Sequence, residues 1–414
     1  MIERINRPEY MKRLVEYKDK DVVKIVTGIR RCGKSTLLDL FEDFLIADNV
    51  PEDNIIHMNM ESLQYRDLIN YVDLYEHVSK RIVKNAKNYL IFDEIQAVGQ
   101  WEKAIESFRL DYDVDIYITG SNAYMLSSEF STFLSGRFVE IRMLPLSFKE
   151  FLTFYEFAPD ASIDGKFQKY LQFGGMPALR QFQFNEARSF EVLEGIYSTV
   201  ILRDVLSRNR AVDQALLHKL ALFLCGNIGS ATSPNNVGNV LTGEGEIQQL
   251  KKKAGKSVAA KTVDKYIRML KNAFVFYSVG RYDVKGKQLL KTMEKIFIVD
   301  IGFRNMLLGY RDADRGHILE NIVYLELLRR DYRVYIGKVG DTEVDFVAEK
   351  PSGKLYVQVA DSVLAESVME RELRPLRTIR DNHEKIVLSM DRNFITSIDG
   401  IKIMNVIDFL LSCT

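Results

Sequence analysis

One stretch, GIRRCGKST at residues 28–36, constrains the fold of this chain more than any other feature. It satisfies the pattern G-x-x-x-x-G-K-[ST] in full, through Gly28, Gly33, Lys34 and Ser35. A loop with this spacing wraps around phosphate groups, so that its backbone N–H groups point inward while the lysine reaches the terminal phosphates and the hydroxyl ligates Mg²⁺. The nucleotide contacts expected from this loop are Gly28, Gly33, Lys34, Ser35 and Thr36.

The sequence on both sides of the loop fits a strand–loop–helix unit. VVKIVT (22–27) is apolar and β-branched, as a buried strand would be. STLLDLFEDFL (35–45) places Leu and Phe at helical spacing. A helix that begins at the end of the loop points the positive end of its dipole at the phosphates. The alternative, a Gly- and Arg-rich surface turn, does not explain these flanks.

Two acidic residues at the end of an apolar strand supply the second half of the expected site. In NYLIFDE (88–94), Asp93 and Glu94 follow a run of apolar residues. Asp93, with Ser35, would hold Mg²⁺, and Glu94 would orient and polarise the attacking water. An exposed acidic turn is the alternative interpretation, but a complete phosphate loop earlier in the chain favours the catalytic one.

Three polar residues further along are candidates for sensing or stabilising charge at this site. Ser121 and Asn122 follow the strand VDIYITG (114–120), where they would report the state of the terminal phosphate, cap a helix, or do both. Arg137, in FLSGRFVEI, precedes a further strand. Its guanidinium would complete the site of a neighbouring subunit, unless it is a surface arginine with a local salt bridge.

Strand and helix patterns alternate over residues 1–145, which predicts a parallel α/β sheet. Helices are expected between the strands, and one of them runs from Ala123 to Leu134. The expected strands are VVKIVT (22–27), NIIHMNM (54–60), NYLIFDE (88–94), VDIYITG (114–120) and FVEIRML (138–144).

The rest of the chain divides into two regions. Residues 146–300 begin with helices, pass through a polar stretch at 243–257 that reads as a mobile loop, and end in a helix followed by a hairpin. This order suggests a winged helix. Residues 301–414 return to mixed α/β, with the strands YRVYI, EVDFVAE, KLYVQVA and KIVLS.

Charge and composition restrict the partners of the chain. Lys plus Arg and Asp plus Glu are 57 each, so only a local patch could bind nucleic acid. Lys261, Lys265, Arg268 and Lys271 give the helix before the hairpin a basic face, which either contacts DNA or is simply solvated.

The start of the chain, its apolar runs and its cysteines indicate where the protein functions. The charged start, MIERINRPEY, is unlike a signal peptide, and no apolar run is long enough to span a membrane. The three widely spaced cysteines predict neither a disulfide framework nor a zinc site. We expect a cytoplasmic protein without a membrane partner.

Taken in order, GIRRCGKST, YLIFDEIQ, ITGSN and LSGRF resemble the motifs of the AAA+ ATPases. The continuation through PLSFKEF, FGGMP, EVDFVA and QVA resembles a narrower group of prokaryotic AAA-type ATPases with a C-terminal module of unassigned function. This resemblance covers nearly the whole chain. It implies binding and slow hydrolysis of ATP, assembly into oligomers, and a helical lid after residue 145. Arg203 is the candidate for an arginine that this lid contributes.

The last domain of that group resembles the PD-(D/E)XK nuclease fold. The fold needs an acid on a helix, an acid on a strand, and an acid-x-Lys on the next strand, so that two carboxylates hold a metal ion. The matching positions here are Glu320, Asp345 and Gln358-Val359-Ala360. Alanine cannot replace the charged ammonium, so we expect a nuclease-like scaffold without nuclease activity. A surviving metal-dependent nuclease is the alternative, and a solvated strand face also explains the acids.

These inferences predict an α/β chain with three parts: a P-loop AAA+ core at 1–145, a helical lid and winged-helix region at 146–300, and a nuclease-like domain at 301–414. The expected activity is Mg²⁺-dependent ATP hydrolysis, coupled to conformational change in the C-terminal domains. The alternative from another class is a nucleotide-gated DNA- or protein-binding module with little turnover. ATP, Mg²⁺, DNA and further copies of the chain are the expected ligands and partners.

Overall fold

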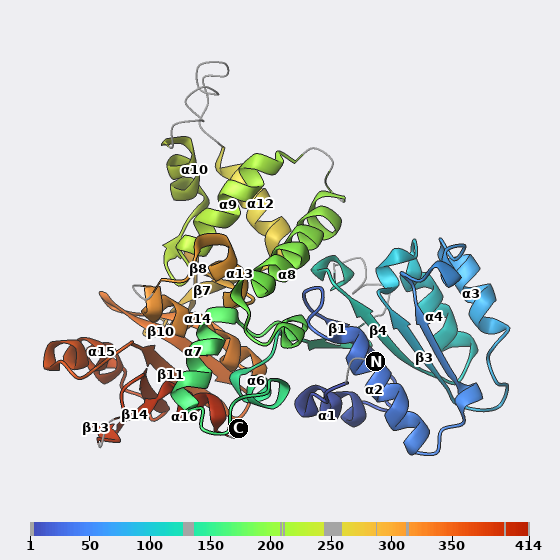
Figure 1. Cartoon of the computed structure of the whole chain (residues 1–414), viewed down its shortest axis with the longest axis horizontal. Coiled ribbons are helices and arrows are strands. Elements are labelled where there is room, and N and C mark those ends of the chain that lie inside the picture. The colour runs from blue at the N-terminus through green and yellow to red at the C-terminus, as the bar shows by residue number, and fades with distance from the viewer. Residues whose placement is uncertain are drawn as a thin grey trace. The chain divides into compact units, whose positions relative to one another are not determined.

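The computed structural model describes residues 4–126, 136–207, 209, 212–243, 259–286, 288–311, 314–392 and 395–412 (Figure 1). Most of the helix expected at 123–134, most of the loop expected at 243–257, and Cys413 lie outside these residues. The chain divides into two compact units, which are Met1–Pro145 together with Asn272–Phe274, and the remainder from Leu146 to Thr414.

The first unit is built on a parallel sheet of five strands in the order β2-β3-β4-β1-β5 (Figure 1). All five strands expected from the sequence are found. Strand β1 lies between β4 and β5. The loop that follows β1 therefore has a neighbouring strand on each side. The strands are β1 (Val23–Thr27), β2 (Ile55–Asn59), β3 (Asn88–Asp93), β4 (Val114–Gly120) and β5 (Phe138–Arg142).

Helices pack on this sheet and explain why its inner strands β1 and β3 are buried along their whole length. Every residue of β1 and of β3 is buried, as expected for a parallel sheet covered by helices. Leu74 of α3 and Phe108 of α4 join Phe92 of β3 in one core cluster. The helices and helical turns are α1 (Pro8–Glu16), α2 (Lys34–Ala47), η1 (Glu52–Asn54), η2 (Leu63–Tyr65), α3 (Tyr71–Ser79), η3 (Ile95–Ala97), α4 (Trp101–Asp111) and η4 (Ala123–Leu126).

A buried ion pair lies on the two central strands of this sheet. Lys24 of β1 and Asp115 of β4 are at most 2% exposed, and the ammonium donates to the carboxylate. Asp115 also accepts from the Tyr117 hydroxyl at 2.8 Å, and Lys24 donates to the Lys20 carbonyl at 3.0 Å. Because each charge is hydrogen-bonded, a lysine can occupy a buried strand position that an apolar residue would otherwise fill.

The second unit holds a mixed sheet of nine strands in the order β13-β14-β12-β11-β10-β9-β7-β8-β6. The hairpin expected before residue 300 is β7 and β8, but β7 also pairs with β9 in parallel. Strands before and after residue 300 therefore belong to one sheet, although the sequence predicted a boundary between two regions there. The strands are β6 (Ala231–Thr232), β7 (Phe276–Asp283), β8 (Gln288–Ile298), β9 (Arg333–Val339), β10 (Thr342–Lys350), β11 (Gly353–Val359), β12 (Glu384–Ser389), β13 (Ser397–Ile398) and β14 (Ile401–Asn405).

The second unit also contains helices and helical turns. Within the described residues of either unit, no helix is long and apolar enough to cross a membrane. The helices and helical turns are α6 (Phe148–Phe154), α7 (Ile163–Phe173), η5 (Pro177–Phe182), α8 (Glu186–Thr199), the π-helical turn η6 (Val200–Leu206), α9 (Gln214–Gly226), α10 (Pro234–Gly243), α12 (Ala260–Asn272), α13 (Ile301–Leu308), α14 (Arg315–Arg329), α15 (Glu366–Thr378) and α16 (Val406–Leu411).

The motif PLSFKEF begins a helix through a reciprocal cap. The Ser147 hydroxyl accepts from the Glu150 N–H at 3.1 Å, and the Glu150 carboxylate accepts from the Ser147 N–H at 2.8 Å. This capping box satisfies two N–H groups that the first turn of α6 would otherwise leave unpaired. It gives the motif a structural reason at the point where the second unit begins.

The motif FGGMP surrounds a buried carboxylate. Asp300 accepts from the Gly175 N–H at 2.6 Å and from the Gly302 N–H at 2.8 Å. A Cβ on Gly174 would lie 2.0 Å from an Asp300 oxygen, and one on Gly175 would lie 2.4 Å from the Leu146 carbonyl oxygen. Both glycines are therefore needed for the close approach of α7, α13 and the chain after residue 145.

The Asp300 carboxyl predicts a pH dependence of stability. Burial raises its pKa from 3.8 to about 6, although the N–H groups of Gly175 and Gly302 lower it. A carboxyl with a raised folded-state pKa stabilises the fold while it is protonated. Its contribution is therefore full below about pH 4 and is lost as the pH rises through about 6. The loss amounts to about 3 kcal/mol.

Urea unfolding of the wild type and of Asp300→Asn, measured in steps from pH 4 to pH 7, checks this expectation. The free energy of unfolding of the wild type minus that of the variant should fall as the pH rises, since only the wild type carries the titrating group. A difference that stays constant over this range would contradict the role given to Asp300.

Candidate nucleotide-binding site

The loop between β1 and α2 needs glycine at two positions. Gly28 has φ +154° and Gly33 has φ +107°, both in the region that favours glycine. A Cβ on Gly28 would lie 2.2 Å from the carbonyl oxygen of Met143, so any side chain there would push the loop off the segment after β5. Gly33 is the N-cap of α2, and the loop therefore leads directly into a helix N-terminus.

The ammonium of Lys34 is buried inside this loop. The residue is only 3% exposed. Its Nζ donates to the carbonyl oxygens of Gly28 at 3.0 Å and Ile29 at 3.2 Å, and lies 3.5 Å from Oε1 of Glu94. The lysine and the acid that the sequence assigned to one site are thus in contact.

Asp93 is fixed at the end of β3 by polar groups from the strands on either side. The Thr119 hydroxyl of β4 donates to one carboxylate oxygen, and the Asn59 amide of β2 donates to the other at 3.0 Å. Asp93 is only 1% exposed. The sequence analysis did not name Thr119 or Asn59. Their signal is a polar residue at the carboxyl end of a parallel strand, which becomes informative once the strand order is known.

Glu94 is held in an orientation that an ordinary strand residue would not adopt. Its φ is +51°, and its N–H donates to the Thr119 hydroxyl at 2.9 Å. Its carboxylate accepts from the Ser121 hydroxyl at 3.0 Å and from the Gln96 amide. Burial raises the pKa of Glu94, but the charge of Lys34 and the Gln96 hydrogen bond outweigh it, so that the pKa is lowered. The carboxylate is ionised at neutral pH.

The remaining residues expected at this site are divided among several places. Ser121 contacts Glu94, whereas the Asn122 side chain accepts from the Tyr124 N–H at 2.9 Å and so caps the turn η4. Ser35 is exposed and Thr36 is half-buried in the first turn of α2. The structure therefore brings Ser121 to the site and gives Asn122 the local capping contact.

Arg137 lies at the opposite edge of the sheet from the loop. Its carbonyl oxygen accepts from the N–H of Val23, the first residue of β1, whereas the loop follows the last. Its side chain is 59% exposed, and Nη1 lies 4.0 Å from Oδ2 of Asp21. The length of β1, about 16 Å, separates Arg137 from the loop of its own chain. A role at a neighbouring subunit's site stays a prediction.

Comparisons with known proteins agree with this geometry. Residues 20–152 match an AAA domain family, and residues 164–314 match a domain of unknown function. An uncharacterized protein of Haemophilus influenzae is 37% identical over 98% of this chain and 98% of its own length. This chain belongs to the same family as that protein. Its first unit is a P-loop nucleotide-binding domain of the AAA type.

Two further relatives extend the comparison. An uncharacterized protein of Methanocaldococcus jannaschii is 28% identical over 85% of this chain and 77% of that protein. The solved structure of a Walker-type ATPase of Pyrococcus abyssi has a TM-score of 0.50 and 17% identity, covering 73% of this chain and 95% of that one. At this identity the likeness concerns the fold.

A second cluster of charges lies in the other unit and includes a residue that the sequence analysis missed. Nζ of Lys295, on β8, lies 3.1 Å from Glu343, 3.5 Å from Glu320 and 3.5 Å from Asp345. Lys295 is 7% exposed. Ala360 left the acid-x-Lys position without an ammonium, and Lys295 brings one to Glu320 and Asp345 from a distant strand.

Gln358 occupies the position of the missing acid and uses both ends of its amide. Its oxygen accepts from the Asp345 N–H at 2.7 Å, and its nitrogen donates to Glu372 at 2.7 Å. Burial, followed by the charge of Glu320, raises the pKa of Asp345 to about 7.

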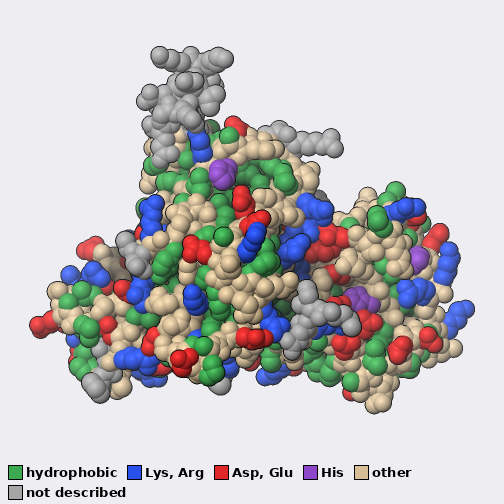
Figure 2. Space-filling model, viewed as in Figure 1, with side chains coloured by type: hydrophobic (Ala, Val, Ile, Leu, Met, Phe, Trp, Pro, Cys, Tyr) green, Lys and Arg blue, Asp and Glu red, His purple; other side chains and the backbone are tan. Residues whose placement is uncertain are grey.

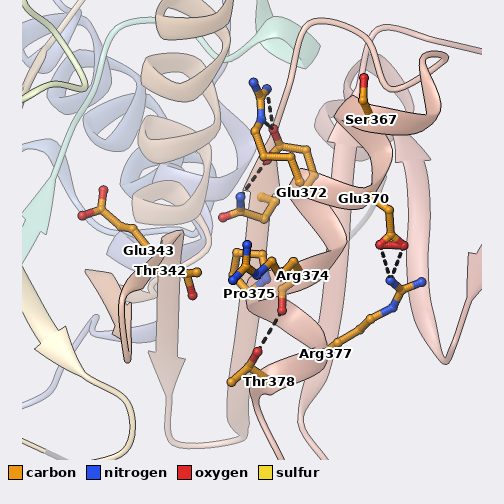
Figure 3. A pocket seen from close by; sticks show the side chains of 11 residues that line it. Thr342, Glu343, Ser367, Glu370, Glu372, Arg374, Pro375, Arg377 and Thr378 are labelled. Carbon is orange, nitrogen blue, oxygen red and sulfur yellow. Dashed lines mark hydrogen bonds and ion pairs between the residues drawn. The ribbon is translucent and has the colours of Figure 1, made fainter.

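A hollow of about 860 Å³ opens beside α15 (Figure 3). Its lining is Thr342, Glu343, Gln358, Ser367, Glu370, Arg371, Glu372, Arg374, Pro375, Arg377 and Thr378.

The basic face expected on α12 is only partly available to a ligand. Lys261, Lys265 and Arg268 are exposed, with Arg268 paired to Asp264 at 2.8 Å. Lys271 instead donates to the Ser278 hydroxyl of β7. On the face that Figure 2 shows, positive and negative side chains are interspersed, in keeping with the zero net charge.

The Lys295 cluster predicts a large loss of stability when its ammonium is removed. Lys295→Met leaves three acidic side chains without their shared cation, so the free energy of unfolding should fall by about 3–5 kcal/mol at pH 7. The loss should be smaller at pH 5, where Asp345, whose pKa is raised to about 7, takes up a proton. Urea unfolding measures both values.

Lys402→Met is the matched control, because Lys402 is 57% exposed in its pair with Glu384. Its removal should change the free energy of unfolding by less than about 1 kcal/mol. Equal effects of the two substitutions would show that the Lys295 cluster contributes no more than a surface ion pair.

Proposed function

We propose that this protein binds ATP in its first unit and hydrolyses it with Mg²⁺. The observation that carries this proposal is the contact of Lys34 with Glu94, 3.5 Å apart and both buried, at the end of the loop-bearing sheet. A phosphate group in the loop would offer Lys34 a stronger acceptor than the Gly28 and Ile29 carbonyls. The ammonium would then leave Glu94, whose carboxylate becomes available to a water molecule.

Glu94 is suited to orient and polarise that water. Its lowered pKa keeps it ionised, so it can accept a hydrogen bond from the attacking water. The Ser121 hydroxyl and the Gln96 amide hold the same carboxylate oxygen and fix its direction. We assign Ser121, rather than Asn122, to reporting the phosphate state, because Ser121 contacts Glu94 and Asn122 caps the turn η4.

Asp93 and Ser35 would hold Mg²⁺, and their chemistry fits this ion. Both offer hard oxygen ligands, and Asp93 is kept in place by Thr119 and Asn59. Mg²⁺ at nucleotide sites takes only one or two carboxylates, with the phosphates and water completing its shell. This agrees with the finding that the described residues contain no group of three or more His, Cys, Asp or Glu suited to a metal. Bound there, the ion neutralises charge on the phosphates.

Residues beyond the first site would couple nucleotide state to assembly and movement. Arg137 is exposed and distant from the loop of its own chain, which suits an arginine that completes the site of a second copy. The helices after residue 145 would act as a lid, with Arg203 of η6 as the arginine that this lid contributes to the nucleotide site. The second unit would change conformation with the nucleotide.

The C-terminal part of the second unit fits a nuclease-like scaffold without nuclease activity. Lys295 contacts Glu320 and Asp345, the acids that a metal ion would need. Both ends of the Gln358 amide are hydrogen-bonded within the protein. We therefore propose that this region is a structural and binding module rather than a phosphodiesterase.

A nucleotide-gated DNA-binding module is the second candidate, favoured by the exposed Lys261, Lys265 and Arg268 on α12. In that case duplex DNA should raise ATP turnover at low salt and lose its effect as the salt concentration rises. The Lys261→Gln/Lys265→Gln variant should respond less. Turnover that is indifferent to DNA at every salt concentration would remove this candidate.

Glu94→Gln tests the main proposal. The variant should bind ATP as the wild type does, because Lys34 and the loop are intact. It should hydrolyse ATP at least about 100-fold more slowly, because it lacks the carboxylate that orients water. Phosphate release and equilibrium binding of a fluorescent ATP analogue measure the two effects.

Two variants serve as controls for this test. Lys34→Ala should abolish binding, and Glu102→Gln on α4, outside the site, should leave binding and turnover unchanged. Normal turnover in Glu94→Gln would remove the assigned role of Glu94, and a wild type that binds no ATP would refute the proposal as a whole.

A further inference from the structure

Arg7, which lies before β1 and outside the loop motif, contacts the back of the nucleotide loop. It is 3% exposed at the start of α1. Its Nη1 donates to the carbonyl oxygens of Leu144 at 2.7 Å and Cys32 at 3.2 Å, and its Nη2 donates to that of Pro145 at 3.3 Å. One buried guanidinium thus joins the loop to the segment that follows β5.

The contact with Cys32 determines where the next N–H group points. A trans peptide unit is planar, so the C=O of Cys32 and the N–H of Gly33 point in opposite directions. When Arg7 draws the Cys32 carbonyl oxygen toward α1, it turns the Gly33 N–H away from α1. Gly33 is the N-cap of α2, the place at which backbone N–H groups and the helix dipole bind phosphate.

Neighbouring contacts also lie between the loop, α1 and the segment after β5. The Cys32 thiol lies 3.6 Å from the Met143 carbonyl oxygen, and Gly28 approaches that same oxygen too closely for a side chain. The Tyr10 hydroxyl accepts from the Leu144 N–H at 3.1 Å, and its ring lies 4.5 Å from the Arg7 guanidinium carbon. Among these groups Arg7 donates to the loop and to the segment after β5 at once.

We infer that Arg7 is a positioning residue for nucleotide binding: it holds the Cys32–Gly33 peptide so that the loop can accept the terminal phosphates. This inference rests on the proposed function, because it concerns the same site. It extends that site to a residue 21 positions before Gly28. Arg7 would act through the loop rather than on the nucleotide.

Arg7→Met in the full chain tests the inference. It removes the donors while keeping a long apolar side chain over Tyr10. The dissociation constant for ATP should rise at least about tenfold, the effect of losing charge-assisted hydrogen bonds. The constant for AMP should rise much less, because the loop holds the terminal phosphates that AMP lacks. The AMP-to-ATP ratio of dissociation constants should therefore fall, which a general loss of stability would not cause.

Two variants make the measurement specific. Tyr10→Phe keeps the ring next to Arg7 but loses the hydroxyl contact with Leu144, so its ATP affinity and its AMP-to-ATP ratio should equal those of the wild type. Arg7→Lys keeps a cation without the fork of donors, so its ratio should lie between those of the wild type and Arg7→Met. Circular dichroism and thermal unfolding show which variants fold. If Arg7→Met does not fold, the ratio measured for Arg7→Lys tests the inference.

Each outcome has a defined meaning. A fall in the ratio in the Arg7 variants but not in Tyr10→Phe supports the inference. An unchanged ratio in a folded Arg7 variant, or an equal fall in Tyr10→Phe, overturns it while the proposed function stands. If the wild type binds ATP no better than Lys34→Ala, the proposed function itself fails, and this result is distinguishable from a failure of Arg7 alone.

Discussion

The burial of the Lys34 ammonium is the constraint on which the first unit depends. A charge removed from water must be compensated by hydrogen bonds or an opposite charge. Lys34 finds both, in the carbonyl oxygens of Gly28 and Ile29 and in the carboxylate of Glu94. These partners fix the turn of the loop and bring the end of β3 beside it. A parallel sheet meets this requirement, because the carboxyl ends of β1 and β3 then lie at the same sheet edge.

A second buried lysine in the first unit shows what is particular about Lys34. Lys24 donates to Asp115, which also accepts from the Tyr117 hydroxyl. The two charges of that pair therefore satisfy each other, and the pair is structural. Lys34 instead contacts both Glu94 and two neutral carbonyl oxygens. A phosphate group can replace these partners of its ammonium. The Lys24–Asp115 pair is therefore static, whereas the proposed function requires Lys34 to change partner. Glu94, with its lowered pKa and its contact with Ser121, is the group that such a change would release.

The sequence predicted those residues of the site that lie close together in one segment, at a spacing that phosphate or metal binding requires. Gly28, Gly33 and Lys34 belong to one loop, and Asp93 and Glu94 follow one strand, so a pattern of letters is enough to find them. Thr119, Asn59 and Gln96 support the same acids, but two of them come from neighbouring strands. Their role depends on strand order, which local periodicity does not contain. Arg7 was not predicted for the same reason, since it donates to backbone carbonyl groups of distant segments.

The second unit shows this limit more strongly. Strands were predicted well there, yet the division at 300/301 does not separate two sheets, because β7 pairs with β9 across it. Lys295 lies on the far side of that division from Glu320 and Asp345, so a comparison restricted to Gln358 and Ala360 found no ammonium. The glycines of FGGMP likewise acquire a reason only from Asp300, which lies in another segment of the chain.

The most direct test of the central claim is an experimental structure of the full chain with Mg²⁺ and a non-hydrolysable ATP analogue. The account predicts that the triphosphate lies in the loop of residues 28–36, with Nζ of Lys34 on its terminal phosphates and withdrawn from Glu94. The Cys32 carbonyl oxygen should keep its contact with Arg7. An analogue bound elsewhere, or a Lys34 ammonium that remains on Glu94 with the loop filled, would contradict the account.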